Sequence, residues 1–137
     1  MEKPKMALDF DNVVVESLAL VRRICFEKKG IILPPHVYRY TEWENPLLTE
    51  EEFLEIVYHV ACPRQWAERV ELMPGVLEGI RELLASGVEI DILTARGHYP
   101  GEIDSVVHVL AKHSLDLRII GTAYQPKSGF LDRHVVM

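Results

Sequence analysis

The chain has 137 residues, of which 48% are hydrophobic and 26% are charged, and its formal net charge is −6 at pH 7. This length and composition fit one compact domain with a sizeable core and exclude an intrinsically disordered chain. The acidic balance argues against a nucleic acid polymer or an anionic membrane as the main partner.

The cellular setting follows from the cysteines and from the N-terminal segment. Cys25 and Cys62 match no metal-ligand spacing, so we expect two buried thiols in a reducing compartment. The first residues reach carboxylates after only a few apolar ones, and no apolar run approaches the length that spans a membrane. We therefore expect a cytoplasmic protein without membrane contact.

The first predicted element is a buried parallel strand, because "KMALDF" is a short apolar run that ends in carboxylates. Residues 17–29 carry apolar side chains at helical spacing, and Gly30 after them is a good helix stop. A segment rich in proline and aromatic residues follows and is interpreted as a structured loop. Together these patterns predict a strand, a helix and a loop in that order.

Two further helices are predicted before residue 73. "LTEEEFLEIVYHV" opens with Thr49 as N-cap and has Glu52 three residues later, which predicts a capping box. "PRQWAERV" is the next helical segment. The large aromatic residues of this region are interpreted as a small hydrophobic core rather than as a base-stacking platform, and they are Tyr38, Tyr40, Trp43 and Trp66.

From Met73 onward, helices and strands alternate. "MPGVLEGIRELLASG" predicts a helix whose inward face includes Leu84, "VEIDIL" a strand, and "PGEIDSVVHVLAKHSL" a helix whose inward face includes Val107. "LRIIGTAY" and "HVVM" predict two more strands. Such alternation calls for an α/β fold with a parallel sheet, a Rossmann-like three-layer sandwich. We expect an α/β core over residues 1–14 and 73–137 and a small helical cap over residues 15–72.

Polar groups of catalytic type stand at the predicted strand ends, where parallel sheets bind their ligands. Asp9 and Asp11 are two residues apart, so their side chains point the same way from an extended backbone. Two such carboxylates repel each other unless a cation intervenes, and Mg²⁺ prefers oxygen ligands of this kind. Thr94 adds a hydroxyl and Lys127 a mobile positive charge. This combination suits a phosphoryl group in transfer.

The same residues carry a resemblance to a known family. "ALDFDNVV" resembles the first motif of the haloacid dehalogenase superfamily, and "MPGVLEGIRELLASGVEIDILTAR" resembles the segment that leads to its second motif. Lys127 lies where the third motif is expected. The insert between the first two motifs is similar to that of the C1-cap members, and "TAR" with a short helical cap is similar to the 5′(3′)-deoxyribonucleotidase-like phosphatases.

The resemblance implies a magnesium-dependent phosphomonoester hydrolase acting on a small or nucleotide-like phosphorylated substrate. Asp9 would be the nucleophile that forms an aspartyl-phosphate, and Asp11 the general acid and base. Thr94 would hold a phosphate oxygen, and Lys127 would neutralise charge on the nucleophile and the transferring group. Mg²⁺ would be bound by the Asp9 carboxylate and the Asp11 backbone carbonyl. Arg96 would contact a substrate phosphate or form an ion pair at the surface.

Two departures from the family pattern affect these expectations. Asn12 stands where many members have glycine, which is tolerable because asparagine accepts unusual φ values. The family's fourth motif places acids directly after the last strand, whereas here Asp132 precedes "HVVM" and no acid follows it. Asp132 is expected at the wrong end of the strand to replace them. We therefore expect weak or absent turnover by this chain.

The missing acids leave an alternative function open. The chain would then be a catalytically impaired or truncated domain that binds a phosphate ligand or a partner protein. A phospho-acceptor receiver domain is disfavoured, because its acceptor aspartate lies on a later strand. An uncovered sheet edge or strand face would also invite association into a homo-oligomer.

Overall fold

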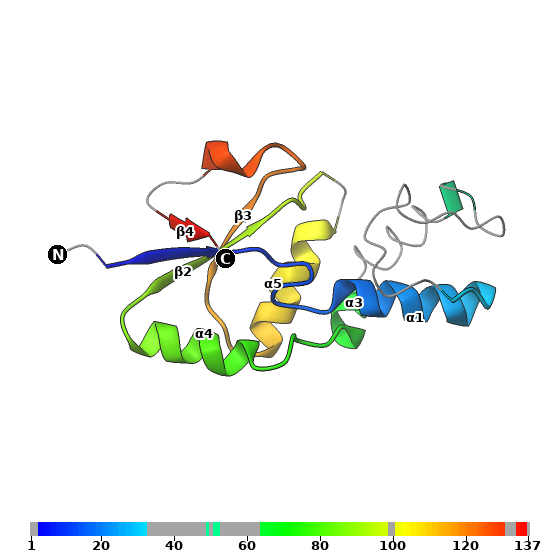
Figure 1. Ribbon diagram of the computed structural model, residues 1–137, viewed down its shortest axis with the longest axis horizontal. Coiled ribbons are helices and arrows are strands. Elements are labelled where there is room, and N and C mark those ends of the chain that lie inside the picture. Colours follow the sequence, from blue (N-terminus) through cyan, green and yellow to red (C-terminus); the bar gives the residue numbers. More distant parts are fainter. Residues whose placement is uncertain are drawn as a thin grey trace.

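The computed structural model describes residues 3–32, 49, 51–52, 64–98, 101–130 and 134–136. Within this part of the chain, four strands form one parallel sheet in the order β3-β2-β1-β4 (Figure 1). The strands are β1 (Lys5–Leu8), β2 (Glu89–Thr94), β3 (Arg118–Gly121) and β4 (His134–Val136). The predicted α/β fold with a parallel, Rossmann-like sheet is confirmed.

The register of the sheet brings the predicted site residues to one edge. Leu8 pairs with Ile92, so Asp9 and Thr94 both stand at the carboxyl ends of neighbouring strands. Thr94 pairs in turn with Gly121, and Val136 pairs with Ala7 on the other side of β1. The strand ends therefore converge as the crossover topology requires.

The helices that connect the strands lie on one side of the sheet. These are α4 (Val76–Ala85) and α5 (Glu102–Lys112), whereas the short 3-10 helix η2 (Lys127–Phe130) lies on the other side (Figure 1). The two described helices of the predicted insert are α1 (Ser17–Lys29) and α3 (Arg64–Arg69), and both lie beyond the carboxyl end of β1 (Figure 1). The insert is thus next to the edge where the predicted site residues stand.

Two side chains that were expected to face inward are exposed. Val107 is 50% exposed and Leu84 is 38% exposed. The stripe of α5 that packs inward consists of Val106, Val109 and Leu110, at the i, i+3 and i+4 positions of a helix. Val107 follows Val106 by one position, which rotates it about 100° away from that stripe.

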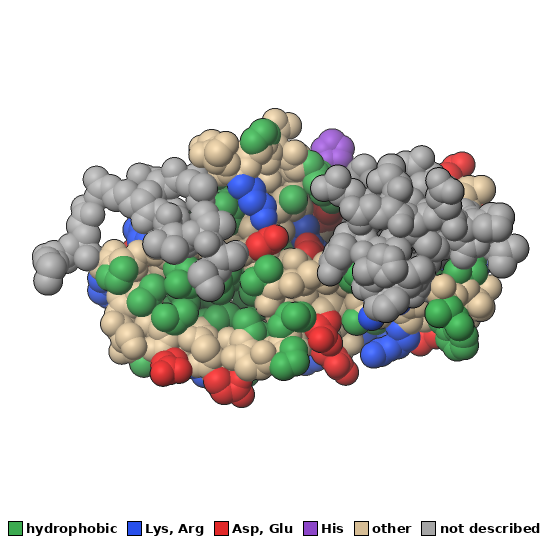
Figure 2. Space-filling model, in the orientation of Figure 1, with side chains coloured by type: hydrophobic (Ala, Val, Ile, Leu, Met, Phe, Trp, Pro, Cys, Tyr) green, Lys and Arg blue, Asp and Glu red, His purple; other side chains and the backbone are tan. Residues whose placement is uncertain are grey.

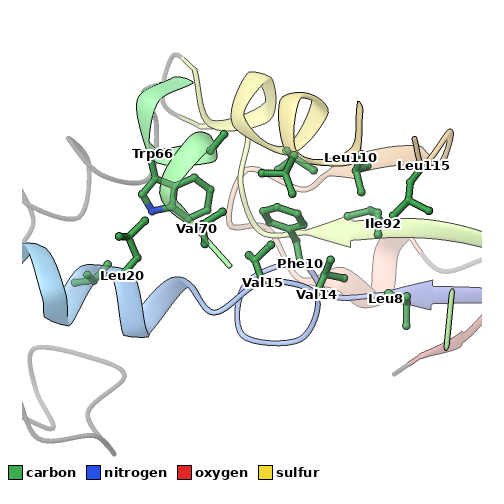
Figure 3. Packing of buried hydrophobic residues seen from close by; sticks show 14 of the residues in the cluster. Leu8, Phe10, Val14, Val15, Leu20, Trp66, Val70, Ile92, Leu110 and Leu115 are labelled. Carbon is green, nitrogen blue, oxygen red and sulfur yellow. The ribbon is translucent and has the colours of Figure 1, made fainter. Parts of the chain in front are cut away.

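One continuous hydrophobic cluster joins the insert to the sheet. Trp66 and Leu20 from the insert helices lie on one side of Phe10, and Ile92 of β2 lies on the other (Figure 3). Trp66 is 3% exposed and is thus a core residue, but it belongs to this shared cluster and not to a separate core of the insert. Cys25 is also buried in this cluster as a free thiol, and burial raises the pKa of that thiol.

The predicted capping box at Thr49 is confirmed. The Glu52 backbone N–H donates to Thr49 Oγ1 at 3.1 Å, and the Thr49 N–H donates to Glu52 Oε1 at 3.2 Å. The bond from the Thr49 backbone N–H to the carboxylate lowers the pKa of Glu52, and so does the Lys29 ammonium at 3.3 Å.

Several predictions concern residues outside the described part of the chain, namely Tyr38, Tyr40, Trp43, Cys62 and Asp132. The boundaries of the cap at residues 15 and 72 stay a prediction. No helix among the described residues is long and apolar enough to cross a membrane.

Candidate active site

The segment that follows β1 is a tight turn in which the side chains of successive residues point in opposite directions. The backbone N–H groups of Val13, Val14 and Val15 all converge on the Phe10 carbonyl, at 2.9–3.3 Å. The Phe10 ring is fully buried, whereas Asp9 and Asp11, on either side of it in sequence, are partly exposed. The two carboxylates therefore face away from the core, as the alternation predicts.

Asn12 allows the chain to turn at this point. Its φ of 60° lies in the left-handed region, where asparagine is one of the few non-glycine residues found regularly. Its Oδ1 accepts the Leu18 backbone N–H at 3.0 Å and so satisfies one of the open donors at the start of α1. The expected tolerance of asparagine here is confirmed.

Asp9 is paired with Lys127. The Lys127 Nζ lies 2.8 Å from Asp9 Oδ1, and the same oxygen accepts the Phe10 N–H at 2.9 Å. Both side chains are partly exposed, at 39% for Asp9 and 31% for Lys127. The two residues are 118 positions apart in sequence, and the return of the chain through η2 brings them together. Their predicted proximity is thus observed.

Asp11 is held differently, by a guanidinium and a hydroxyl. Arg96 Nε donates to Asp11 Oδ2 at 2.8 Å, and Arg96 Nη2 donates to Asp11 Oδ1 at 2.6 Å. The Ser17 hydroxyl donates to Oδ1 at 2.5 Å. The Arg96 side chain is only 4% exposed, whereas the Asp11 side chain is 34% exposed, so the ion pair joins a buried guanidinium to a carboxylate that reaches the surface. A contact between Arg96 and a substrate phosphate stays a prediction, and it would share the guanidinium with Asp11.

Thr94 is fully buried at the end of β2. Its Oγ1 accepts the Arg96 backbone N–H at 3.3 Å, which is the turn-type role of a threonine hydroxyl. The hydroxyl proton has no acceptor among the described residues. A bond from this hydroxyl to a phosphate oxygen stays a prediction.

The loops after β2 and β3 are bonded to each other. The Tyr124 N–H donates to the Ala95 carbonyl at 2.7 Å, and the Ala123 N–H donates to the Arg96 carbonyl at 3.1 Å. Ala123 and Tyr124 both have positive φ, at 51° and 65°. The loop after β3 thus holds the backbone of Arg96 in place through these hydrogen bonds.

Glu102 supports the same loop from the first turn of α5. It is 2% exposed, and its Oε1 accepts the backbone N–H groups of Gly97 at 3.3 Å and His98 at 3.1 Å. The Tyr124 hydroxyl donates to Oε2 at 2.7 Å. A carboxylate that accepts three donors tolerates burial, because these bonds replace its lost hydration.

Sequence reasoning missed Ser17 and Glu102 at this site. Both stand in the first turn of a helix, where serine and glutamate are common as capping residues, so their residue type did not set them apart. The only available signal was position: Ser17 follows Asp11 by six residues, and Glu102 follows Arg96 by six residues.

The two partly exposed carboxylates of the site each have a cation as partner. Two carboxylates, Asp9 and Asp11, face two cations, Lys127 and Arg96. Figure 2 shows acidic and basic side chains gathered side by side in the middle of one face of the molecule. A cluster of this kind can receive an anion, because the partly exposed Lys127 ammonium can turn its donors toward the incoming group.

The donor types at this edge fit Mg²⁺ in part. Asp9 Oδ2 has no hydrogen bond within the described residues, and the Asp11 carbonyl likewise accepts none there. Both are hard oxygen donors, and Mg²⁺ is commonly bound by one or two carboxylates with water and phosphate oxygens completing its shell. The described residues contain no group of three or more histidine, cysteine or acidic side chains placed to hold a metal.

Comparison with known proteins gives structural matches only. No family model and no curated protein matches the sequence. A class C acid phosphatase from Bacillus anthracis, solved with tungstate bound, superposes with a TM-score of 0.54 at 15% identity, over 95% of this chain and 46% of that one.

Two further structures carry the family's name. A HAD family hydrolase from Deinococcus radiodurans, solved with phosphate and sodium, matches with a TM-score of 0.52 at 17% identity, over 89% of this chain and 59% of that one. A HAD-superfamily hydrolase from Geobacter sulfurreducens matches with a TM-score of 0.52 at 17% identity, over 90% and 65% of the two chains. The present chain thus spans about half to two thirds of the length of these structures. The protein has the fold of the haloacid dehalogenase superfamily.

Proposed function

We propose that the protein is a phosphomonoester hydrolase that acts through an aspartyl-phosphate on Asp9. The observation that carries the proposal is the pairing of two carboxylates with two cations at the carboxyl edge of the sheet. The Asp9 carboxylate is partly exposed beside Lys127, while Asp11 is held by Arg96. The bound tungstate and phosphate of two structurally similar hydrolases support an oxyanion as the ligand of such a fold.

In this mechanism, an Asp9 oxygen attacks phosphorus and the bond from phosphorus to the leaving oxygen breaks. Asp11, which enters this step in its protonated form, gives that proton to the leaving oxygen, and the alcohol departs. In the second step Asp11 takes a proton from water, and the water oxygen attacks phosphorus. The bond between phosphorus and the Asp9 oxygen breaks, which releases inorganic phosphate and regenerates the Asp9 carboxylate. Lys127 stays beside Asp9 and offsets the negative charge that collects there in both steps.

The geometry of Asp11 is compatible with proton transfer. Its Oδ2 accepts one hydrogen bond, from Arg96 Nε, within the described residues. A carboxylate oxygen has two lone pairs, so one of them remains for the transferred proton. Mg²⁺, held by the Asp9 carboxylate and the Asp11 carbonyl, would supply positive charge to the phosphoryl oxygens when bound. The substrate class proposed is a small or nucleotide-like phosphomonoester, with a C1-type helical cap covering it.

Phosphate release in the presence and absence of Mg²⁺ tests this function. The substrates are p-nitrophenyl phosphate, glycerol phosphate and a set of deoxynucleoside monophosphates. We expect slow, Mg²⁺-dependent release that Asp9→Asn reduces to background, because the amide cannot attack phosphorus to form the acyl phosphate. Asp104→Asn is the matched control, since Asp104 is exposed on α5 and outside the site.

Mass spectrometry of the peptide that contains Asp9 gives a second readout, as a phosphoryl adduct should accumulate in a rapid acid quench. Binding of tungstate without any turnover or adduct would contradict the hydrolase and would favour the impaired, phosphate-binding alternative. Release that is equal in the wild type and in Asp9→Asn would contradict the assignment of the nucleophile.

A further inference from the structure

The Arg96 guanidinium is held by hydrogen bonds in its plane and by aromatic rings over its faces. Its Nε and Nη2 form a fork on the two oxygens of Asp11, at 2.8 and 2.6 Å, and its Nη1 lies 3.4 Å from the Glu102 carbonyl. A guanidinium is planar and permanently charged, so such a fork sets both the position and the rotation of its carboxylate partner.

Aromatic rings hold the same guanidinium by its faces. The Arg96 Cζ lies 4.4 Å from the centroid of the Trp66 ring and 5.2 Å from that of the Phe10 ring. These distances are within the range of cation–π contact. Phe10 stands between Asp9 and Asp11 in sequence, whereas Trp66 comes from α3 of the insert. Figure 3 shows the Trp66 and Phe10 side chains lying toward each other in the core.

The geometry points to Arg96 as a positioning residue for Asp11 and to Trp66 as the residue by which the insert holds Arg96 in place. This inference rests on the proposed function of Asp11 as the acid and base. It adds that the insert contributes to the proton-transfer step indirectly, through the contact of Trp66 with Arg96 and without touching the substrate.

The consequence for chemistry depends on the leaving group. An alkoxide is strongly basic, so its departure requires a proton from a carboxyl group held at the right place and angle. A p-nitrophenolate is weakly basic and departs with little protonation. Misplacing Asp11 should therefore slow the cleavage of alkyl phosphates far more than the cleavage of p-nitrophenyl phosphate. A loss of general stability, or of phosphate binding, would slow both.

The first experiment compares Arg96→Lys with the wild type in single turnovers with excess enzyme. Lysine keeps the charge but lacks the fork. We expect about a 100-fold slower release of glycerol from glycerol phosphate, the lower range of a general acid's contribution, and a much smaller change with p-nitrophenyl phosphate. An equal loss with both substrates, or a loss confined to KM, would overturn the inference and favour direct contact of Arg96 with the phosphate.

The chain contains a matched control for this substitution. Arg69 of α3 also pairs with a carboxylate, but through one nitrogen only, with Nη2 at 2.8 Å from Glu27 Oε1 and 3.1 Å from Oε2. That pair is about half exposed and lies away from the site. Arg69→Lys should leave the ratio of the two rates unchanged.

Two substitutions test Trp66. Trp66→Phe keeps an aromatic face and should retain most of the wild-type ratio. Trp66→Met keeps apolar volume without that face, so it should reproduce the selective loss of Arg96→Lys to a smaller degree. Equal ratios in the two variants would overturn the role of Trp66. Circular dichroism checks the folding of each variant, and the Phe variant and Arg96→Lys carry the test if Trp66→Met does not fold.

A nuclear magnetic resonance measurement separates this inference from the proposed function. The Nε–H signal of Arg96, identified by its loss in Arg96→Lys, should exchange slowly with water in the wild type and in Trp66→Phe. It should exchange faster in Trp66→Met. This readout needs no turnover, so an inactive chain would contradict the proposed function and leave the fixation of Arg96 measurable. Fast exchange in the wild type would overturn the positioning itself, whatever the activity.

Discussion

Asp9 and Asp11 are two residues apart, yet they are held by cations of different kinds. The Lys127 ammonium beside Asp9 is a single charge on a flexible stem, and both groups are partly exposed. The Arg96 guanidinium beside Asp11 is buried and forms a rigid fork. A nucleophile must move toward phosphorus, and an acid must keep its angle to the leaving oxygen. The two kinds of pair suit these two tasks.

At this scale we predict that Lys127→Ala separates activity from stability. Loss of the ammonium leaves the charge at Asp9 without its partner and should lower kcat by about 10²- to 10³-fold. The free energy of unfolding should change by less than about 1 kcal/mol, because a partly exposed ion pair is screened by water. Activity assays and urea denaturation measure the two effects.

Lys5→Ala is the control for this prediction. Lys5 stands at the opposite end of β1 and pairs with Glu89 at 3.9 Å with similar exposure. Lys5→Ala should leave activity unchanged, and it should change the free energy of unfolding as little as Lys127→Ala does. A drop in stability as large as the drop in activity for Lys127→Ala would contradict a role for Lys127 in charge neutralisation.

At the scale of elements, the site depends on how closely two loops approach each other. Gly121 ends β3, and a Cβ at this position would lie 2.8 Å from the Arg96 carbonyl oxygen and 2.7 Å from Ile103 Cδ1. The side chain of Ile103 can move, but the carbonyl belongs to the loop that carries Arg96. The absence of a side chain at Gly121 therefore allows the loops after β2 and β3 to come close enough for the hydrogen bonds that connect them.

We predict that Gly121→Ala destabilises the protein by about 1–3 kcal/mol, as overpacking does, and lowers activity by displacing Arg96. The matched control is Gly79→Ala within α4, where a Cβ would meet nothing within 4 Å. That substitution should stabilise the helix by up to about 1 kcal/mol. Thermal and urea unfolding of both variants give the comparison. Two variants of equal stability would contradict the close approach at Gly121.

At the scale of the whole molecule, the insert and the sheet share one hydrophobic cluster. It contains residues of α1 and α3 as well as residues of β1, β2 and α5. Phe10 lies at the junction, with insert side chains on one side and sheet side chains on the other (Figure 3). Since neither part has a separate cluster in the described residues, we expect both to unfold in one cooperative transition.

Cys25 provides a probe for this prediction, because it is a fully buried residue of α1 in the insert. Burial raises the pKa of its thiol, so the reactive thiolate is disfavoured in the folded state and forms only after unfolding. In a Cys62→Ser background, modification of Cys25 in increasing urea should follow the same curve as the loss of far-ultraviolet circular dichroism. Modification at lower urea than the loss of helix signal would show that the insert opens independently.

Local sequence patterns were sufficient to predict the order of the elements, the parallel sheet and the side of the strand on which the carboxylates stand. Apolar runs and helical spacing are local properties, and the alternation at Asp9, Phe10 and Asp11 follows from the two-residue period of an extended backbone. The approach of Lys127 to Asp9 followed from a family resemblance and from strand order. The predicted inward faces of α4 and α5 included two residues too many. Leu84 and Val107 are apolar but exposed, because an apolar side chain does not by itself show which neighbour it packs against.

The pairing of each cation with its carboxylate could not be predicted in this way. Arg96 and Asp11 are 85 residues apart, and Trp66, whose ring covers the guanidinium, belongs to a third segment. Their meeting depends on turns with positive φ at Asn12, Ala123 and Tyr124 and on hydrogen bonds between loops of different strands. Such contacts are set by the packing of the whole chain, because arginine and aspartate are also common at surfaces and in turns, so their residue types do not identify a partner.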